Sequence, residues 1–205
     1  MAKDKIEDFI DEMGLAKGNY YIILQDVGKD KFKMMAYDTS GKEHKHETDH
    51  SVASVMHEGL VGLLTTKGED LFNFGYSELA YRYSTGRMFD EILDEVEDFI
   101  KEMGLAKGNY YIILQDVGND KFKMMAYDTT GKEHKSETDH SVASVMHEGL
   151  VGLLTTKGED LFNFGFSELA YRYTTGRMFD EILDEVDKQK EIKYRDNVIE
   201  VDFSK

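Results

Sequence analysis

The sequence predicts an α+β fold made of two copies of one module. The prediction rests on a 90-residue internal repeat, on runs of β-branched and aromatic residues with period two, and on apolar residues at helical spacing. Residues 8–97 match residues 98–187 at 83 of 90 positions. We therefore divide the chain into a first copy (1–97), a second copy (98–187) and a tail (188–205).

Each copy begins with a predicted helix and a predicted hairpin. Residues 4–13 carry apolar side chains at helical spacing and precede Gly14, a typical residue for the end of a helix. Residues 19–27 and 31–38 are rich in β-branched and aromatic side chains, which indicates a β-hairpin. The side chains of its first strand alternate between two faces, with Tyr20, Ile22 and Leu24 on one and Tyr21 and Ile23 on the other.

The middle of each copy predicts an edge strand and a second helix. Residues 39–42 read as a turn, which leaves residues 43–47 as a possible polar edge strand. A helix follows from about Asp49, and Thr48 or Asp49 is placed to cap it. Its apolar face is formed by Val52, Val55, Met56, Leu60, Leu63 and Leu64.

The end of each copy predicts a short strand and a further helix. Residues 71–74 read as an extended segment that ends at Gly75, and a helix begins at Ser77 and continues through Tyr83. The order within one module is therefore α-β-β-(β)-α-β-α, with helices packed on a small antiparallel sheet.

The junction between the copies and the tail carry two more signals. Apolar residues keep helical spacing across residues 87–103 without a turn signal, so a continuous helix is expected to join the copies rigidly. In the tail, residues 197–203 alternate apolar and polar side chains, which is typical of a short strand.

Composition limits the classes of function. The chain has 41 acidic and 25 basic residues, a net charge of −16, and no cysteine, which excludes disulfides and thiolate metal sites. No apolar run reaches the roughly 18 residues that a membrane helix needs, so we expect a cytoplasmic protein without membrane contact. The negative charge opposes direct nucleic-acid binding and favours a basic protein partner.

The favoured hypothesis is a non-enzymatic, acidic protein-interaction module that binds or inhibits a basic protein surface, as a nucleic-acid mimic, an antidote or a viral antagonist of host factors does. Carboxylates crowd the polar side of the junction helix and its counterpart in the second copy. They form the predicted partner-binding face, which comprises Asp90, Glu91, Asp94, Glu95, Glu97, Asp98, Asp180, Glu181, Asp184 and Glu185.

An alternative is a protein that binds or sequesters a small anionic ligand, a nucleotide or metabolite, at two equivalent sites. Guanidinium groups among aromatic rings are able to hold a phosphate or carboxylate. These sites comprise Arg82, Tyr83, Arg87, Arg172, Tyr173 and Arg177. Glu78 lies four residues before Arg82, however, so an ordinary ion pair within one helix is the competing explanation.

A metal site, a cofactor and an enzymatic activity find no support in the sequence. His44, His46, His50 and His57 form the densest group of metal-ligand types. His50 and His57, on the predicted helix, are seven residues apart, about 10 Å along the axis and too far to share an ion, and Ser136 replaces His46 in the other copy. No phosphate loop, dinucleotide fingerprint or nucleophile elbow occurs. A third hypothesis is a structural protein that self-assembles through its edge strand or its tail strand.

Overall fold

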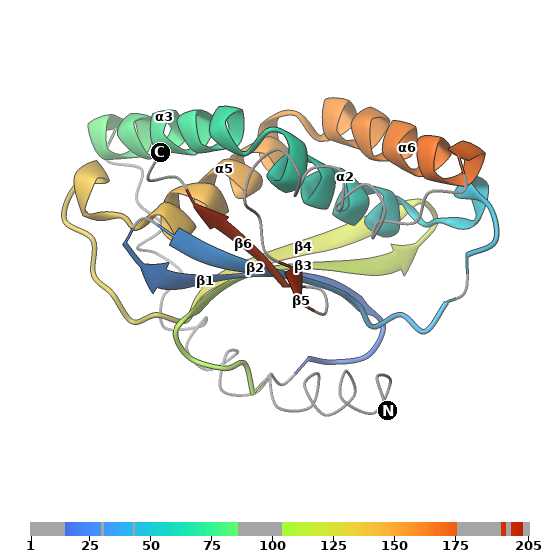
Figure 1. Ribbon diagram of the computed structural model, residues 1–205, viewed down its shortest axis with the longest axis horizontal. Helices are drawn as coiled ribbons and strands as arrows, with labels where there is room; N and C mark the ends of the chain where they lie inside the picture. The colour runs from blue at the N-terminus through green and yellow to red at the C-terminus, as the bar shows by residue number, and fades with distance from the viewer. Residues whose placement is uncertain are drawn as a thin grey trace.

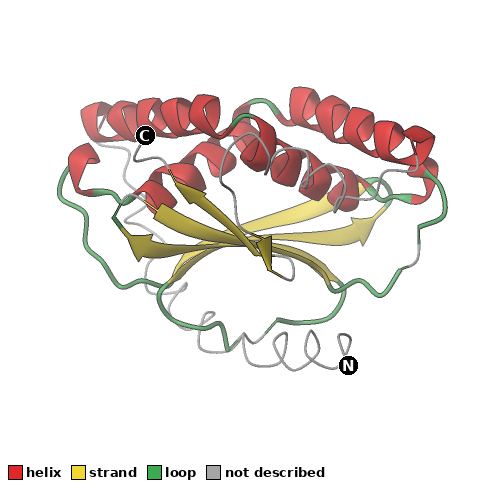
Figure 2. Cartoon of the chain, in the orientation of Figure 1, coloured by secondary structure: helices red, strands yellow, loops and turns green. Residues whose placement is uncertain are grey.

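The computed structural model describes residues 15–29, 31–42, 44–85, 104–175, 194–195 and 198–202. Antiparallel strands form one sheet, and helices cover one of its faces (Figure 1 and Figure 2). The predicted α+β class is confirmed. None of the helices in these ranges is both long and apolar enough to cross a membrane.

The elements of residues 19–85 recur in the same order in residues 109–175. In the first copy they are β1 (Asn19–Gly28), β2 (Lys31–Asp38), the 3₁₀ turn η1 (Glu47–Asp49), α2 (Val52–Thr66) and α3 (Gly68–Thr85). In the second copy they are β3 (Asn109–Gly118), β4 (Lys121–Asp128), η2 (Glu137–Asp139), α5 (Val142–Thr156) and α6 (Gly158–Thr175). The tail contributes β5 (Tyr194–Arg195) and β6 (Val198–Asp202).

The two copies share a single sheet. Its strand order is β4-β3-β1-β2-β6-β5. The β1–β2 hairpin of the first copy therefore lies beside the β3–β4 hairpin of the second, with β1 next to β3. At the centre of the antiparallel pair β1–β3, Ile22 stands opposite Ile112, its own equivalent in the repeat. A local pseudo-twofold axis therefore passes between these two strands. The predicted tail strand is confirmed as β6, which pairs with β2.

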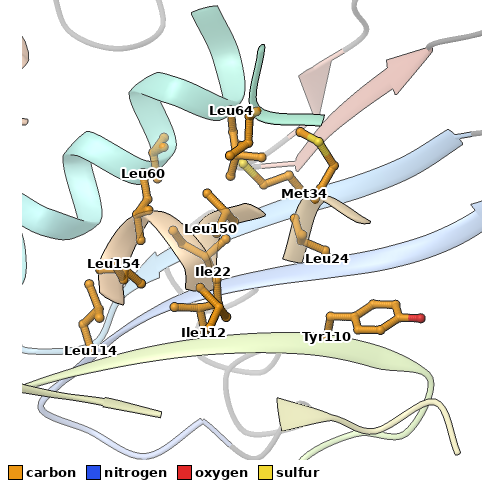
Figure 3. Packing of buried hydrophobic residues seen from close by; sticks show 14 of the residues in the cluster. Ile22, Leu24, Met34, Leu60, Leu64, Tyr110, Ile112, Leu114, Leu150 and Leu154 are labelled. Atoms are coloured by element: carbon orange, nitrogen blue, oxygen red, sulfur yellow. The ribbon is translucent and has the colours of Figure 1, made fainter. Parts of the chain in front are cut away.

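The hairpin prediction and its two faces are confirmed. Tyr20, Ile22 and Leu24 point into a core between the sheet and the helices, which also contains Leu60 and Leu150 (Figure 3). Tyr21 and Ile23 lie in a second core on the opposite face of the sheet, with Leu15, Leu105 and their counterparts Tyr111 and Ile113. Both faces of β1 and β3 are thus buried, which is why their apolar run is nearly continuous.

The second helix begins later than predicted. Residue 52 is the first residue of α2, and the Ser51 hydroxyl caps it by accepting a hydrogen bond from the backbone N–H of Ser54. The predicted caps Thr48 and Asp49 are therefore wrong. The Asp49 carboxylate instead accepts hydrogen bonds from the backbone N–H groups of Lys45 and His46, at 3.0 and 3.1 Å.

The predicted polar edge strand at residues 43–47 is also wrong for its described part. Residues 44–46 form no strand, and the 3₁₀ turn begins at residue 47. The two hydrogen bonds to Asp49 close this segment into a turn, and the His44 ring stacks on the His50 ring with centroids 4.0 Å apart. An extended strand would break both arrangements.

The short strand predicted at residues 71–74 and the helix start at Ser77 are wrong. Helix α3 runs without interruption through both. Its buried residues are Leu71, Gly75 and Leu79, spaced four apart on one face of the helix. The alternating aromatics at positions 72 and 74 suggested a strand, but the contact with a neighbouring helix decides in favour of the helical period.

Two predicted helices fall outside the described residues. These are the N-terminal helix at residues 4–13 and the continuous junction helix at residues 87–103. Both stay predictions.

Candidate functional site

The outer helix of each copy, α3 or α6, packs on the other copy. Helix α3 lies against α5, and α6 lies against α2, so α2 and α5 are held between the sheet and the outer helices (Figure 1). The contact is backbone to backbone at a glycine. A Cβ atom at Gly75 would lie 2.0 Å from the backbone oxygen of Val145, and one at Gly165 would lie 2.1 Å from that of Val55. No residue larger than glycine fits this approach.

This crossing brings the end of α6 to the start of α2. The Tyr173 hydroxyl lies 3.1 Å from the backbone oxygen of His44 and 3.0 Å from Nε2 of His50. On its other side, His50 places Nδ1 at 2.7 Å from the Ser54 hydroxyl. Every group is satisfied if Tyr173 donates to the carbonyl, His50 donates through Nε2, and Ser54 donates to Nδ1. His50 is then neutral.

The same network recurs between α3 and the start of α5. The Tyr83 hydroxyl lies 3.2 Å from the backbone oxygen of His134 and 3.0 Å from Nε2 of His140. His140 in turn places Nδ1 at 2.7 Å from the Ser144 hydroxyl. We call these two sets the histidine–tyrosine networks. Each joins a tyrosine of one copy to histidines of the other.

The electrostatics favour neutral histidine in both networks. Burial, and then the neighbouring His44, lower the pKa of His50. Burial, and then His134, lower the pKa of His140 to about 4. Stacking with ring centroids at 3.9 Å places His134 against His140, so a second positive charge there would meet direct repulsion. Near neutral pH the networks are therefore uncharged hydrogen-bonded contacts.

An ion pair between the copies accompanies each network, formed by the arginine that precedes the network tyrosine. Nη1 of Arg172 donates to Glu58 at 2.5 Å, and Arg82 makes the equivalent bond to Glu148. The four side chains are only 14 to 19 % exposed. Burial raises the pKa of Glu58, but His57 and then Arg172 outweigh burial and lower that pKa to about 2. The pKa of Glu148 is lowered in the same way by His147 and Arg82.

The sequence predicted some of these residues but not their partners. Arg82, Tyr83, Arg172 and Tyr173 do lie together near the helix ends. The competing explanation paired Arg82 with Glu78 of its own helix, whereas Arg82 also pairs with Glu148 of the other copy, 66 residues away.

The other predicted site residues lie outside the described ranges. They include Arg87, Arg177 and the whole acidic face. Among the described residues no three histidine, aspartate or glutamate side chains are grouped as metal ligands.

No family model, curated protein or solved structure matches this chain.

The networks hold the two copies together and do not present a reactive group. A serine hydroxyl 2.7 Å from an imidazole has the geometry of a nucleophile and its base. Ser54 is only 2 % exposed, however, and both ring nitrogens of His50 are engaged within the protein. A substrate does not reach this hydroxyl. The network fixes the outer helix of one copy on the inner helix of the other.

Sequence reasoning missed the pairing of histidine with tyrosine. One local signal existed, because His50 and Ser54 are four residues apart and the same spacing occurs at His140 and Ser144. Tyr173 lies 123 residues from His50, and nothing in the chain's periodicity reports such a distant contact.

Proposed function

We propose that this protein is a non-enzymatic, acidic interaction module that binds a basic protein surface through its outer helices. The observation that supports this most directly is the exposure of large aromatic side chains on α3 and α6, namely Tyr76, Tyr81, Phe166, Tyr171 and Tyr173. The first turns of the same helices carry the acidic residues Glu69, Asp70, Glu159 and Asp160.

Exposed aromatic side chains on helices that also carry acidic residues are suited to binding a protein partner. Tyrosine supplies a large contact area at low entropic cost, and aromatic residues are enriched in the centres of protein interfaces. Neither α3 nor α6 contains a lysine, and the arginine of each is ion-paired with a glutamate of the other copy. The ammonium groups of Lys67 and Lys157 lie over the rings of Phe164 in α6 and Phe74 in α3, so the like charge that a basic partner meets near these helices includes those two lysines.

The chain's overall charge supports the same partner class. A net charge of −16 steers basic proteins toward the molecule and makes their association sensitive to salt. The predicted acidic face at residues 90–98 and 180–185 follows directly after α3 and α6 in sequence. We include it in the proposed surface, together with the rigid junction helix expected at residues 87–103.

The alternative of a small anionic ligand gains no comparable support. The Nη1 groups of Arg82 and Arg172 already donate to Glu148 and Glu58. An anionic ligand at either arginine would have to displace a carboxylate that the protein itself provides.

The test is a quantitative pull-down with three baits at low and high salt. Against the wild type we set a Tyr81→Ser, Tyr171→Ser variant, which changes two tyrosines that are 54 % and 48 % exposed. The matched control changes two exposed valines at the hairpin ends, Val27→Ser and Val117→Ser. We expect basic proteins on the wild type and on the valine control, and their loss from the tyrosine variant and at high salt.

A second arm reverses charge at Asp90, Glu91, Asp94 and Glu95. The proposal predicts that these substitutions to lysine abolish capture of basic proteins. Partners that remain bound at high salt, after charge reversal and without the two tyrosines would refute it.

A further inference from the structure

Strands β2 and β4 have the same sequence but different neighbours. Both read Lys-Phe-Lys-Met-Met-Ala-Tyr-Asp. Strand β2 is paired on both sides, with β1 and with β6 of the tail. Strand β4 is paired with β3, and no strand of the described chain pairs with its other edge. Within the described residues the sheet therefore ends at β4, and the backbone groups on that edge have no strand beside them.

The exposed edge carries apolar side chains that its twin buries. In β2, Phe32 and Met34 are 0 % and 2 % exposed. The equivalent side chains in β4, Phe122 and Met124, are only partly buried against the same core. Because the two sequences are identical, the difference comes from the surroundings of the strands and not from their chemistry.

The pairing of β6 with β2 shows which strand fits this sequence. In the antiparallel register, Lys31 and Lys33 stand opposite Asp202 and Glu200. The apolar positions between them also match, with Phe32 opposite Val201 and Met34 opposite Ile199. Opposite charges and apolar pairs at facing positions both stabilise a strand pair.

We infer that β4 binds an added antiparallel strand from a partner protein, with the pattern apolar, apolar, acidic, apolar, acidic. Lys121 and Lys123 select the two acidic positions, and the open backbone of β4 supplies the hydrogen bonds. The chain has a single tail, and that tail is paired with β2. The described tail strand is thus already paired, and we assign the strand on β4 to another molecule.

This site is separate from the surface proposed above. It is a basic sheet edge that takes an acidic strand, whereas the outer helices are an acidic face that takes a basic surface. Each proposal is tested on a different surface, so refuting one leaves the other unaffected.

The probe is a fluorescent peptide of the sequence Asp-Asn-Val-Ile-Glu-Val-Asp-Phe, which copies residues 196–203. It is titrated against the full chain and followed by fluorescence anisotropy. We expect saturable binding of one peptide per chain. Lys123→Glu replaces an exposed side chain and should weaken binding about tenfold, since one facing pair changes from attraction to repulsion.

Two matched controls locate the site. The protein variant Lys123→Glu should regain binding with a peptide in which lysine replaces the glutamate copied from Glu200. Lys33→Glu, the same change in β2, should leave binding of the original peptide unchanged, because the site is on β4.

Three results would overturn the inference. The first is no saturable binding at millimolar peptide. In that case Lys121 and Lys123 serve only to keep other strands from pairing with the edge of β4. The second is loss of binding with Lys33→Glu but not with Lys123→Glu, which would indicate exchange with the chain's own tail. The third is dimerisation of the chain in sedimentation that Lys123→Glu abolishes, which would assign the edge to a second copy.

Discussion

Replacing Gly75 by alanine tests whether the outer helix of each copy packs on the other copy. Gly75 lies where α3 crosses α5, and an added Cβ would lie 2.0 Å from the backbone oxygen of Val145 and 2.9 Å from the backbone nitrogen of Gly149. Ordinary contacts of a Cβ atom begin at about 3.4 Å. Backbone atoms on α5 cannot rotate away as a side chain does, so the two helices must separate by more than 1 Å.

The expected cost is the balance of opposing effects. Alanine improves the intrinsic stability of a helix over glycine by about 1 kcal/mol. Overpacking a close contact costs up to about 3 kcal/mol. Separation of the helices also weakens the dispersion contacts of Leu71 and Leu79, which are both 3 % exposed, by an estimated ~1 kcal/mol. We expect Gly75→Ala to lower the free energy of unfolding by about 3 kcal/mol.

Urea unfolding followed by circular dichroism measures this change, and the repeat supplies its own controls. Gly165→Ala makes the same clash at the other crossing and should cost the same. Gly158→Ala is the matched control, because its Cβ would meet only Met56 Cε, at 3.9 Å, and stability should be unchanged or slightly higher. A Gly75→Ala protein as stable as the Gly158→Ala protein would refute the crossing of α3 on α5.

Three further predictions concern the networks and a hairpin turn. Tyr83→Phe removes the hydroxyl that bonds across the copies and should lower the unfolding free energy by about 1–2 kcal/mol in thermal unfolding, whereas Tyr81→Phe should have little effect. The pKa of His140 is about 4 in the folded protein, so as pH falls His140 is protonated in the unfolded chain before it is protonated in the folded one. The free energy of unfolding should therefore decline between about pH 6.5 and 4, by about 1–2 kcal/mol after allowance for the partial exposure of His140. Lys29→Asn should raise the melting temperature, because φ is +56° at Lys29 and asparagine, present at Asn119 with φ +53°, tolerates this left-handed conformation better.

Each of these has an outcome that contradicts it. If Tyr83→Phe and Tyr81→Phe lower the unfolding free energy equally, the Tyr83 hydroxyl does not stabilise the contact between the copies. A His140→Gln variant should show a smaller acid-induced decline in urea midpoint, and an unchanged decline would place the titrating group elsewhere. A melting temperature that falls with Lys29→Asn would show that Lys29 makes a contact that outweighs the strain at its positive φ.

The hairpin shows how far local pattern carries a prediction. Alternation in the first strand assigned Tyr20, Ile22 and Leu24 to one face and Tyr21 and Ile23 to the other, and both assignments are confirmed. The strand period is a property of the backbone, so consecutive side chains point to opposite faces whatever the strand packs against.

The segment at residues 71–74 shows where local pattern fails. Its alternating aromatics have the strand period, yet the segment belongs to a helix. Leu71 and Gly75 gain their burial from α5 of the other copy, and a glycine is informative only when its close neighbour is known. The histidine–tyrosine networks were unpredictable for the same reason, since Tyr83 meets His140 across 57 positions.

The sequence by itself determined the class of fold, the repeat of 90 residues, the hairpin with its two faces, the tail strand and the acidic charge, because periodicity, identity and charge are local or additive properties of a chain. The tertiary structure alone decided that the copies share one sheet and exchange their outer helices, and that identical strands differ at the two ends of the sheet. Those features depend on which surfaces meet in space. Two copies of one sequence have the same local preferences, and only their packing against each other distinguishes one pairing from another.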